Sequence, residues 1–250
     1  MFGEKGRVGP RRWRLIATLY LAALVTTACG TANATRSAAS ESDHKTLVVE
    51  FDVTKSLTRQ FRVEARDAVA AALPRLTHGD HGAIDIYVRK IDHSSGSDEA
   101  AVASYHVRGV HKCAENNPFD QACRNARIAS VRSARAEARE IAAAIRRLNL
   151  PRGESGTVIR GGLAAAGEIF ADEEGLKLLV VASDMRPSHA SPPRPKVVLN
   201  GVHVILLFSC RQPIAVCQQR RSSWAAELSH DGAASVRILD AQQMTELFRG

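Results

Sequence analysis

The sequence lacks an apolar run long enough to cross a bilayer as a helix. Its longest such run, residues 15–25, has about 11 residues, whereas a membrane-spanning helix needs about 20. We therefore expect no permanent transmembrane anchor. Basic residues precede the run and small residues follow it, and this order is typical of a secretory signal peptide. The sequence thus predicts an exported protein whose signal peptide is residues 1–28.

Two motifs of common α/β enzymes are also missing. No Gly-x-Gly-x-x-Gly follows the first predicted strand, so we expect no Rossmann-type dinucleotide site. No Gly-x-Ser-x-Gly nucleophile elbow is present, which argues against a serine hydrolase. We therefore expect neither of these two enzyme classes.

Positive charge is less abundant in the folded part than the formal net charge of +8 indicates. Residues 1–28 carry five basic and one acidic side chain, so half of that charge belongs to the signal peptide. The remaining +4 gives little support to a nucleic-acid partner. A solvated helix face accounts for most of the arginines at helical spacing, with attraction to anionic lipid headgroups as the alternative; they are Arg124, Arg127, Arg132, Arg135, Arg139, Arg146 and Arg147.

The end of the signal peptide carries a cysteine. Residues 24–29, LVTTAC, resemble the lipobox of bacterial lipoproteins, in which the cysteine is diacylated and becomes the new N-terminus. Thr26 stands where that family usually has Leu, and an ordinary cleaved signal is the alternative. The resemblance implies a lipid on Cys29 that holds the protein on a bacterial membrane, facing outside the cytoplasm.

A small, polar segment without aromatic residues follows Cys29. Residues 30–45 cannot bury enough apolar surface to fold, so we expect a lipidated, flexible tether over residues 29–45 and a domain over residues 46–250.

Four further cysteines fall within the predicted domain, and outside the cytoplasm this number suggests two disulfides. Three pairings are possible; the local pairs Cys113–Cys123 and Cys210–Cys217 are the simplest. A zinc site is the competing interpretation, although the sequence lacks the closely spaced CxxC pairs that such sites favour.

Strand and helix patterns alternate along the predicted domain. Buried-strand runs cover residues 46–51, 176–182 and 202–209, with further strands at 83–91, 101–110 and 234–239. Helical patterns cover residues 59–76, 126–148, 157–171, 212–228 and 241–248. This order predicts an α/β fold with a mostly parallel, doubly wound sheet and helices on both faces.

Oxygen-bearing side chains follow the strands at the edge where open α/β sheets bind ligands. Asp52, Thr54 and Ser56 follow the first strand, Thr157 lies in a loop before a helix, and Asp184 follows the strand at 176–182. Carboxylates and hydroxyls of this kind suit Mg²⁺ or Mn²⁺ with an open coordination position.

These residues resemble the von Willebrand factor type A domain, over roughly residues 46–250. The metal-ion-dependent adhesion site of that family has Asp-x-Ser-x-Ser after the first strand, and residues 52–56, DVTKS, match it with Thr54 for the first Ser. Thr157 and Asp184 match the family's later Thr and Asp, while Met185 stands where Gly is common.

The resemblance implies a role for each of these residues. Thr54 and Ser56 would coordinate the metal through their hydroxyls, Thr157 directly or through water, and Asp52 and Asp184 mostly through water. A carboxylate from a protein partner would complete the coordination, so the site would be a device for binding a protein or an envelope component.

Two alternatives remain at this point. The first is a metal-free scaffold of the same fold. The second is a phosphatase, because Asp52 after a first strand also resembles the nucleophile of haloacid-dehalogenase-type enzymes. That family has a second Asp two positions on, where this chain has Thr54.

Overall fold

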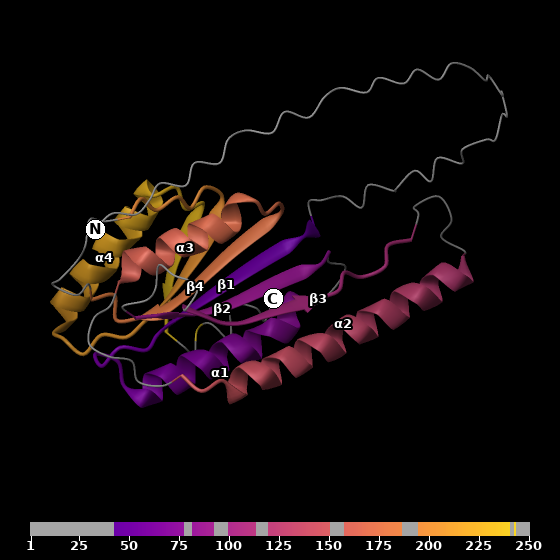
Figure 1. Cartoon of the computed structure of the whole chain (residues 1–250), viewed down its shortest axis with the longest axis horizontal. Helices are drawn as coiled ribbons and strands as arrows, with labels where there is room; N and C mark the ends of the chain where they lie inside the picture. Colours follow the sequence, from indigo (N-terminus) through magenta and orange to yellow (C-terminus); the bar gives the residue numbers. More distant parts are fainter. Residues whose placement is uncertain are drawn as a thin grey trace, which may run out of the picture. The chain divides into compact units, whose positions relative to one another are not determined.

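Alternating strands and helices build a six-stranded sheet with helices packed on it (Figure 1). In chain order the elements are β1 (Lys45–Asp52), α1 (Arg59–Leu76), β2 (Ile84–Ile91), β3 (Ala101–Val107), α2 (Gln121–Arg147), α3 (Ile159–Ala171), β4 (Leu176–Ser183), β5 (Val202–Phe208), α4 (Ile214–His230) and β6 (Ser235–Leu239).

The computed structural model describes residues 43–77, 82–92, 100–113, 120–150, 158–186, 195–240 and 243. The predicted signal peptide, Cys29, most of the predicted tether and Thr157 lie outside the described residues, as does the predicted helix at 241–248 apart from Gln243. None of the helices within the described ranges is both long and apolar enough to cross a membrane.

The strand order is β3-β2-β1-β4-β5-β6, so β1 and β4 lie at the centre of the sheet. Every neighbouring pair is parallel except β2 and β3, which are antiparallel. The chain winds outward from β1 in one direction and from β4 in the other. This topology confirms the predicted α/β class with a mostly parallel, doubly wound sheet.

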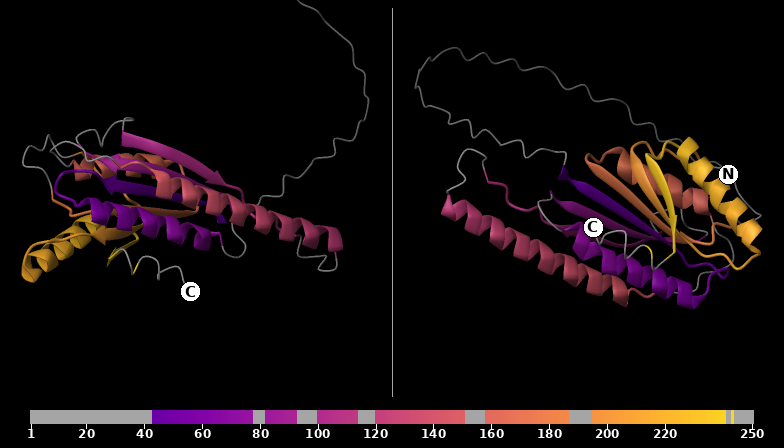
Figure 2. Two further views of the ribbon diagram at one scale, coloured as in Figure 1. Left: turned by 90° about the horizontal axis from the view of Figure 1, so that it is seen from below. Right: turned by 180° about the vertical axis from the view of Figure 1, so that it is seen from behind.

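Helices cover both faces of the sheet (Figure 2). Odd-numbered β1 side chains such as Val49 and Phe51 belong to the core beneath α1 and α2, whereas Val48, on the other face, belongs to the core beneath α3 and α4. Strands that are buried on both sides need near-continuous apolar sequence, which is why the runs in β1, β4 and β5 predicted their positions well. Glu50 and Asp52 interrupt that pattern on the α3 face.

Two element boundaries differ from the sequence prediction for identifiable reasons. Strand β1 begins within the segment predicted as a tether, because the Lys45 amide donates to the Ala83 carbonyl at 3.0 Å. Helix α2 begins at Gln121, five residues before the predicted start, because the Asp120 carboxylate caps it by accepting from the Cys123 amide at 3.0 Å.

The first half of α2 lies mostly in solvent. Its buried side chains begin only at Ala134 and continue to Ile145. All seven arginines that predicted a solvated helix face are exposed. That prediction is therefore confirmed.

Both local disulfides are present. Cys113–Cys123 joins the segment after β3 to the first turn of α2, and Cys210–Cys217 joins the end of β5 to the start of α4. The predicted pairing is confirmed, and zinc binding by these four cysteines is excluded because none remains a free thiolate.

Candidate metal centre

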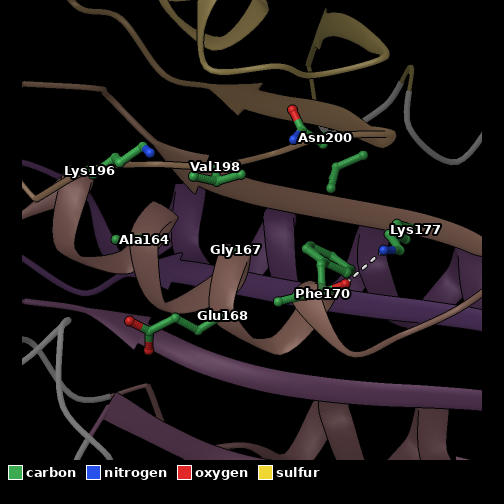
Figure 3. Close-up of a pocket in the computed structure, with 10 residues that line it drawn as sticks. Ala164, Gly167, Glu168, Phe170, Lys177, Lys196, Val198 and Asn200 are labelled. Atoms are coloured by element: carbon green, nitrogen blue, oxygen red, sulfur yellow. Dashed lines mark hydrogen bonds between the residues drawn. The ribbon is translucent and has the colours of Figure 1, made fainter.

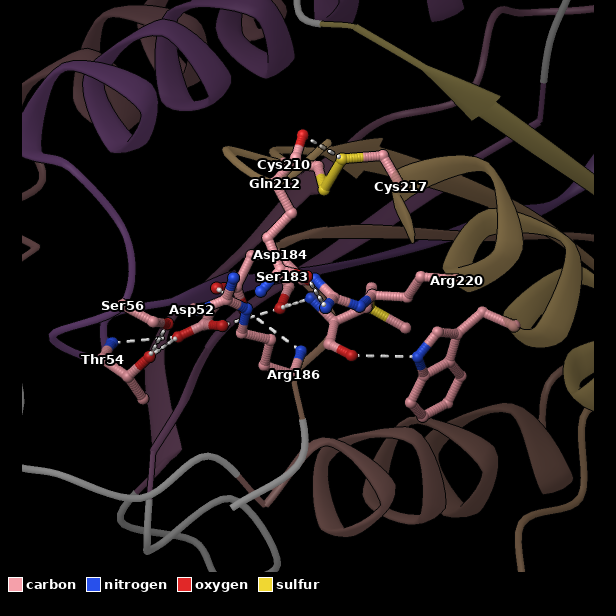
Figure 4. A network of polar contacts seen from close by, with 12 residues as sticks. Asp52, Thr54, Ser56, Ser183, Asp184, Arg186, Cys210, Gln212, Cys217 and Arg220 are labelled. Carbon is pink, nitrogen blue, oxygen red and sulfur yellow. Dashed lines mark hydrogen bonds and ion pairs between the residues drawn. A yellow bond between two sulfur atoms is a disulfide. The ribbon is translucent and has the colours of Figure 1, made fainter. Parts of the chain in front are cut away.

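Asp52 ends β1 with a buried carboxylate that accepts three hydrogen bonds (Figure 4). Oδ1 accepts from the Thr54 amide at 2.9 Å and from the Thr54 hydroxyl at 2.6 Å. Oδ2 accepts from the Ser183 hydroxyl at 2.6 Å. The carboxylate is thus fixed in orientation by donors from the loop after β1 and from β4.

The hydroxyls of Thr54 and Ser56 lie side by side, with 3.0 Å between Oγ1 and Oγ. Because Thr54 donates its proton to Asp52, Ser56 is the donor in the contact between the two hydroxyls. Neighbouring ligands of an octahedral Mg²⁺ with bonds of about 2.0–2.1 Å are separated by about 2.9 Å. The spacing and the type of these two oxygens therefore fit one edge of a Mg²⁺ or Mn²⁺ coordination shell.

Asp184 lies just after β4 at the same edge of the sheet. Its Oδ1 accepts from the Arg186 amide at 3.1 Å, and its Oδ2 is 3.7 Å from Arg186 Nε. Asp184 and Ser56 both border a small cavity of about 40 Å³. The residues around that cavity are Ser56, Asp184, Arg186, Ser209, Cys210, Arg211 and Arg220.

Burial raises the pKa of Asp52, and the nearby charge of Asp184 raises it further. The hydrogen bonds from Ser183 and Thr54 act in the opposite direction. The two carboxylates therefore repel each other across the edge of the sheet, and a divalent cation between them would remove that repulsion.

Met185 follows Asp184 in a left-handed backbone conformation, with a φ of 53°. Glycine adopts such a conformation without steric cost, and this is a physical reason for Gly to be common at this position in von Willebrand factor type A domains. Met185 is held there by two hydrogen bonds: its amide donates to Ser183 Oγ at 2.8 Å, and its carbonyl accepts from Trp224 Nε1 at 3.0 Å. Its side chain is fully buried.

The structure brings four of the five predicted metal-site residues to one edge: Asp52, Thr54, Ser56 and Asp184. Thr157, the fifth, lies outside the described residues. The helix that follows it begins at this edge, because the Val158 amide donates to the Asp92 carbonyl at 3.4 Å, just beyond β2.

Sequence reasoning missed three contributors. The contact of Ser183 with Asp52 could in principle have been predicted from the strand register. Phe51 of β1 pairs with Ala182 of β4, so the residues that follow them, Asp52 and Ser183, lie side by side on the same face of the sheet. The two arginines had no such signal. Arg186 contacts Asp184 from a loop, and Arg220 reaches the Asp184 carbonyl at 3.3 Å from α4.

A larger cavity, of about 530 Å³, is bounded by α3, β4 and the segment before β5 (Figure 3). Lys177, which is part of its wall, donates to the Phe170 carbonyl at 2.7 Å, and Lys196 lies on the opposite wall. Among the described residues that line it, none belongs to the predicted metal site.

No protein-family model and no curated sequence matches the chain. Solved structures with a similar fold include the pilus adhesin SpaC from Lactobacillus rhamnosus GG in an open conformation, at 11% identity and a TM-score of 0.47. They also include proximal thread matrix protein 1 from the mussel byssus, at 14% identity and a TM-score of 0.44, and the manganese-loaded TRAP protein of Plasmodium vivax, at 10% and 0.43.

The matched regions cover most of this chain but differing shares of the other proteins. They cover 83% of this chain and 29% of SpaC, 84% and 45% for the mussel protein, and 82% and 72% for TRAP. The chain thus spans less than half the length of the first two. These are similarities of fold.

The chemistry of the edge follows from its donors alone. Two hydroxyl oxygens at coordination spacing, one fixed carboxylate and a second carboxylate beside a small cavity form a set of hard oxygen ligands. Such a set suits a hydrated divalent cation with a position open to an outside ligand.

Proposed function

We propose that the chain is an extracytoplasmic lipoprotein that binds a protein or envelope partner through a Mg²⁺ or Mn²⁺ ion held at the Asp52 edge. Thr54 and Ser56 would hold the ion through their hydroxyls, while Asp52 and Asp184 would act mostly through water. Bound there, the ion would supply an open coordination position for a carboxylate of the partner. Thr157 completes the proposed set.

The observation that carries the proposal is the 3.0 Å contact between the Thr54 and Ser56 hydroxyls beside a fixed Asp52 carboxylate. A cap that only stabilised the loop after β1 would need the Asp52–Thr54 contact alone. The exposed Ser56 hydroxyl adds a second hard oxygen that faces the cavity. The arrangement therefore supports a ligand and not only a turn.

The arginines around the cavity favour an anionic partner group. Arg186, Arg211 and Arg220 border the same cavity as Ser56 and Asp184. A carboxylate that enters it would meet positive charge as well as the ion, and charge complementarity of this kind speeds association and improves specificity.

The ion pair between Arg186 and Asp184 supports the metal-free scaffold as a second candidate. Arg186 partly neutralises Asp184, with 3.7 Å between the charged atoms, and so reduces the attraction for a cation. In that case the same cavity would bind an acidic partner through its arginines, and the binding would not depend on metal.

Metal titration separates these candidates. Because an ion that binds only the native state stabilises it, the melting temperature of the parent protein should rise with Mg²⁺ or Mn²⁺ concentration. Asp52→Ala should abolish the rise, and Asp52→Asn, which keeps the shape and the acceptor for Ser183 but removes the charge, should reduce it strongly. Differential scanning fluorimetry in EDTA-treated buffer measures both effects.

Asp67→Ala is the matched control, because Asp67 is a partly exposed aspartate of α1 that pairs only with the neighbouring Arg66 among the contacts described. It should leave the Mg²⁺ response unchanged. A parent melting curve that does not move in millimolar Mg²⁺ or Mn²⁺ would refute the metal site and leave the scaffold. Partner capture from envelope extracts should then be equal with Mg²⁺ and with EDTA.

A further inference from the structure

A second group of metal-ligating side chains lies at the opposite end of β1, outside the predicted site. Register pairing aligns Thr46 of β1 with Asp85 of β2, and Asp85 with His106 of β3. These three side chains therefore share one face of the sheet. His44 precedes β1, and Glu173 lies between α3 and β4.

The two distances from His44 to the carboxylates of this cluster match a tetrahedral zinc shell. His44 Nε2 is 3.2 Å from Asp85 Oδ2 and 3.4 Å from Glu173 Oε2, and the three ligand atoms all lie within 4.8 Å of one another. Zinc bonds to histidine and carboxylate are about 2.0–2.2 Å long, so neighbouring ligands in a tetrahedral shell are about 3.3 Å apart. Both measured separations are close to that value.

The cluster contains two carboxylates, those of Asp85 and Glu173, beside the imidazole of His44. Two negative charges this close repel each other, and a divalent cation bound between them would remove that repulsion.

Outer contacts already orient the ligand oxygens. Thr46 Oγ1 donates to Glu173 Oε2 at 3.2 Å, and His106 Nδ1 lies 2.7 Å from Asp85 Oδ1, the carboxylate oxygen that does not face His44. Support of this kind is typical of metal sites, in which ligating carboxylates are themselves hydrogen-bonded.

The backbone around the cluster is anchored to the sheet. The carbonyl of His44 accepts from the Leu176 amide at 2.9 Å, and the next residue, Lys45, donates to Ala83. His44, Asp85 and Glu173 are each about one-quarter exposed, so an ion could enter and retain water as a fourth ligand.

We propose that His44, Asp85 and Glu173 form a second divalent-cation site, selective for Zn²⁺-class ions and separate from the Asp52 edge. An imidazole nitrogen together with two carboxylates favours Zn²⁺ over Mg²⁺, which prefers oxygen ligands alone. The site joins β1, β2 and the α3–β4 connection at the amino ends of the parallel strands.

Isothermal titration of the full chain, prepared without a polyhistidine tag and stripped with EDTA, tests this site with ZnCl₂ as the probe. We expect about one equivalent of Zn²⁺ to be bound with micromolar affinity or tighter, and the melting temperature to rise with Zn²⁺. His44→Ala should weaken binding about 100-fold or more, because it removes the only nitrogen ligand of the three. His106→Ala, which affects only an outer contact, should weaken it about 10-fold.

His111→Ala is the matched control. His111 lies beside the Cys113–Cys123 disulfide, whose sulfurs cannot act as thiolates, so this variant should bind Zn²⁺ like the parent. Asp52→Ala should also retain Zn²⁺ binding, and His44→Ala should retain the Mg²⁺ response. These two arms distinguish failure of this site from failure of the proposed Mg²⁺ site.

Absence of Zn²⁺ binding by the folded parent, or equal binding by the parent and His44→Ala, overturns the proposal. If His44→Ala does not fold, as judged by circular dichroism, Glu173→Gln answers the same question, because it keeps the shape of the side chain and the Thr46 acceptor while removing a charged ligand. Retention of parent affinity by Glu173→Gln would then overturn it.

Discussion

At the scale of single residues, Met185 shows how two opposing free-energy terms are combined at one position. A left-handed conformation costs a residue with a Cβ about 1–2 kcal/mol relative to glycine. Burial of a methionine side chain contributes about 1.5–3 kcal/mol, and the whole of Met185 is inaccessible to solvent. The free energy gained by burying the side chain offsets the cost of the left-handed backbone. The chain can therefore keep a large residue where von Willebrand factor type A domains commonly have Gly.

This balance predicts an unusual order of stability for two variants. Met185→Ala should lose about 2–5 kcal/mol of unfolding free energy, because it removes the buried side chain and keeps the backbone cost. Met185→Gly loses the same packing but relieves the backbone, so it should be at least as stable as Met185→Ala. Urea denaturation of the two variants measures the difference.

Leu179 of β4 supplies the comparison, since it is fully buried in ordinary strand conformation. There Leu179→Gly should be less stable than Leu179→Ala by about 0.5–1 kcal/mol. If Met185→Gly were likewise less stable than Met185→Ala, the positive φ of Met185 would make no contribution to the free energy of unfolding.

The candidate site illustrates which residues a sequence pattern can identify. Asp52, Thr54 and Ser56 are neighbours in the chain, so their convergence needed only a correctly placed strand. Arg220 contacts the loop after β4 from α4, 36 residues away from Asp184. A contact of that range depends on how a helix packs, and no local pattern encodes it.

At the scale of elements, the contact between β1 and α3 contains a buried carboxyl group. Glu50 is fully buried on the α3 face, and a Cβ on Gly162 of α3 would lie only 2.2 Å from Glu50 Oε2. Glycine at that position therefore lets the helix approach the sheet. Burial raises the pKa of Glu50 to about 8, although the positive charge of Arg89 opposes the shift.

This packing predicts that stability falls as the pH rises. Between the ordinary pKa of 4.5 and the native value of about 8, the unfolded chain has lost the Glu50 proton while the native state keeps it. The stabilising contribution is complete below the first value and is lost as the pH approaches the second, with a slope of up to about 1.4 kcal/mol per pH unit. Glu50→Gln should remove this component.

Urea denaturation at several pH values between 5 and 8, in EDTA, measures the slope. Glu168→Gln, an exposed change in the same helix layer, should leave the slope of the parent intact. Equal slopes for the parent and Glu50→Gln would contradict the prediction.

Most elements were predictable because burial on both faces of a sheet leaves a strong apolar signal. The predicted helix at 59–76 matches α1, and the predicted strand at 176–182 is one residue shorter than β4. The exposed first turns of α2 carry no such signal, since their residues contact mainly solvent. Their start depends instead on the single cap at Asp120.

At the scale of the whole chain, the lipid anchor remains a prediction on residues outside the described part. Cys29→Ala should release the protein from the membrane or leave it unprocessed, because no acyl chain can be attached. Fractionation of cells that express the parent or Cys29→Ala, followed by immunoblotting, measures the membrane-bound share. A Cys113→Ala variant controls for loss of a cysteine as such.

If Cys29→Ala is cleaved and remains on the membrane like the parent, the anchor is not a lipid on this residue. The domain would then need another attachment. The metal predictions do not depend on this outcome, because they concern residues that lie within the sheet and its loops.

Strand β1 holds the two candidate ion sites at a fixed distance from each other. Thr46 borders one and Asp52 forms the other, and six residues of strand at about 3.3 Å each separate them by about 20 Å. The Debye length at physiological salt is about 8 Å, so two divalent charges at these ends would hardly affect each other. The two ends of the strand would therefore load independently, each following the free concentration of its own metal.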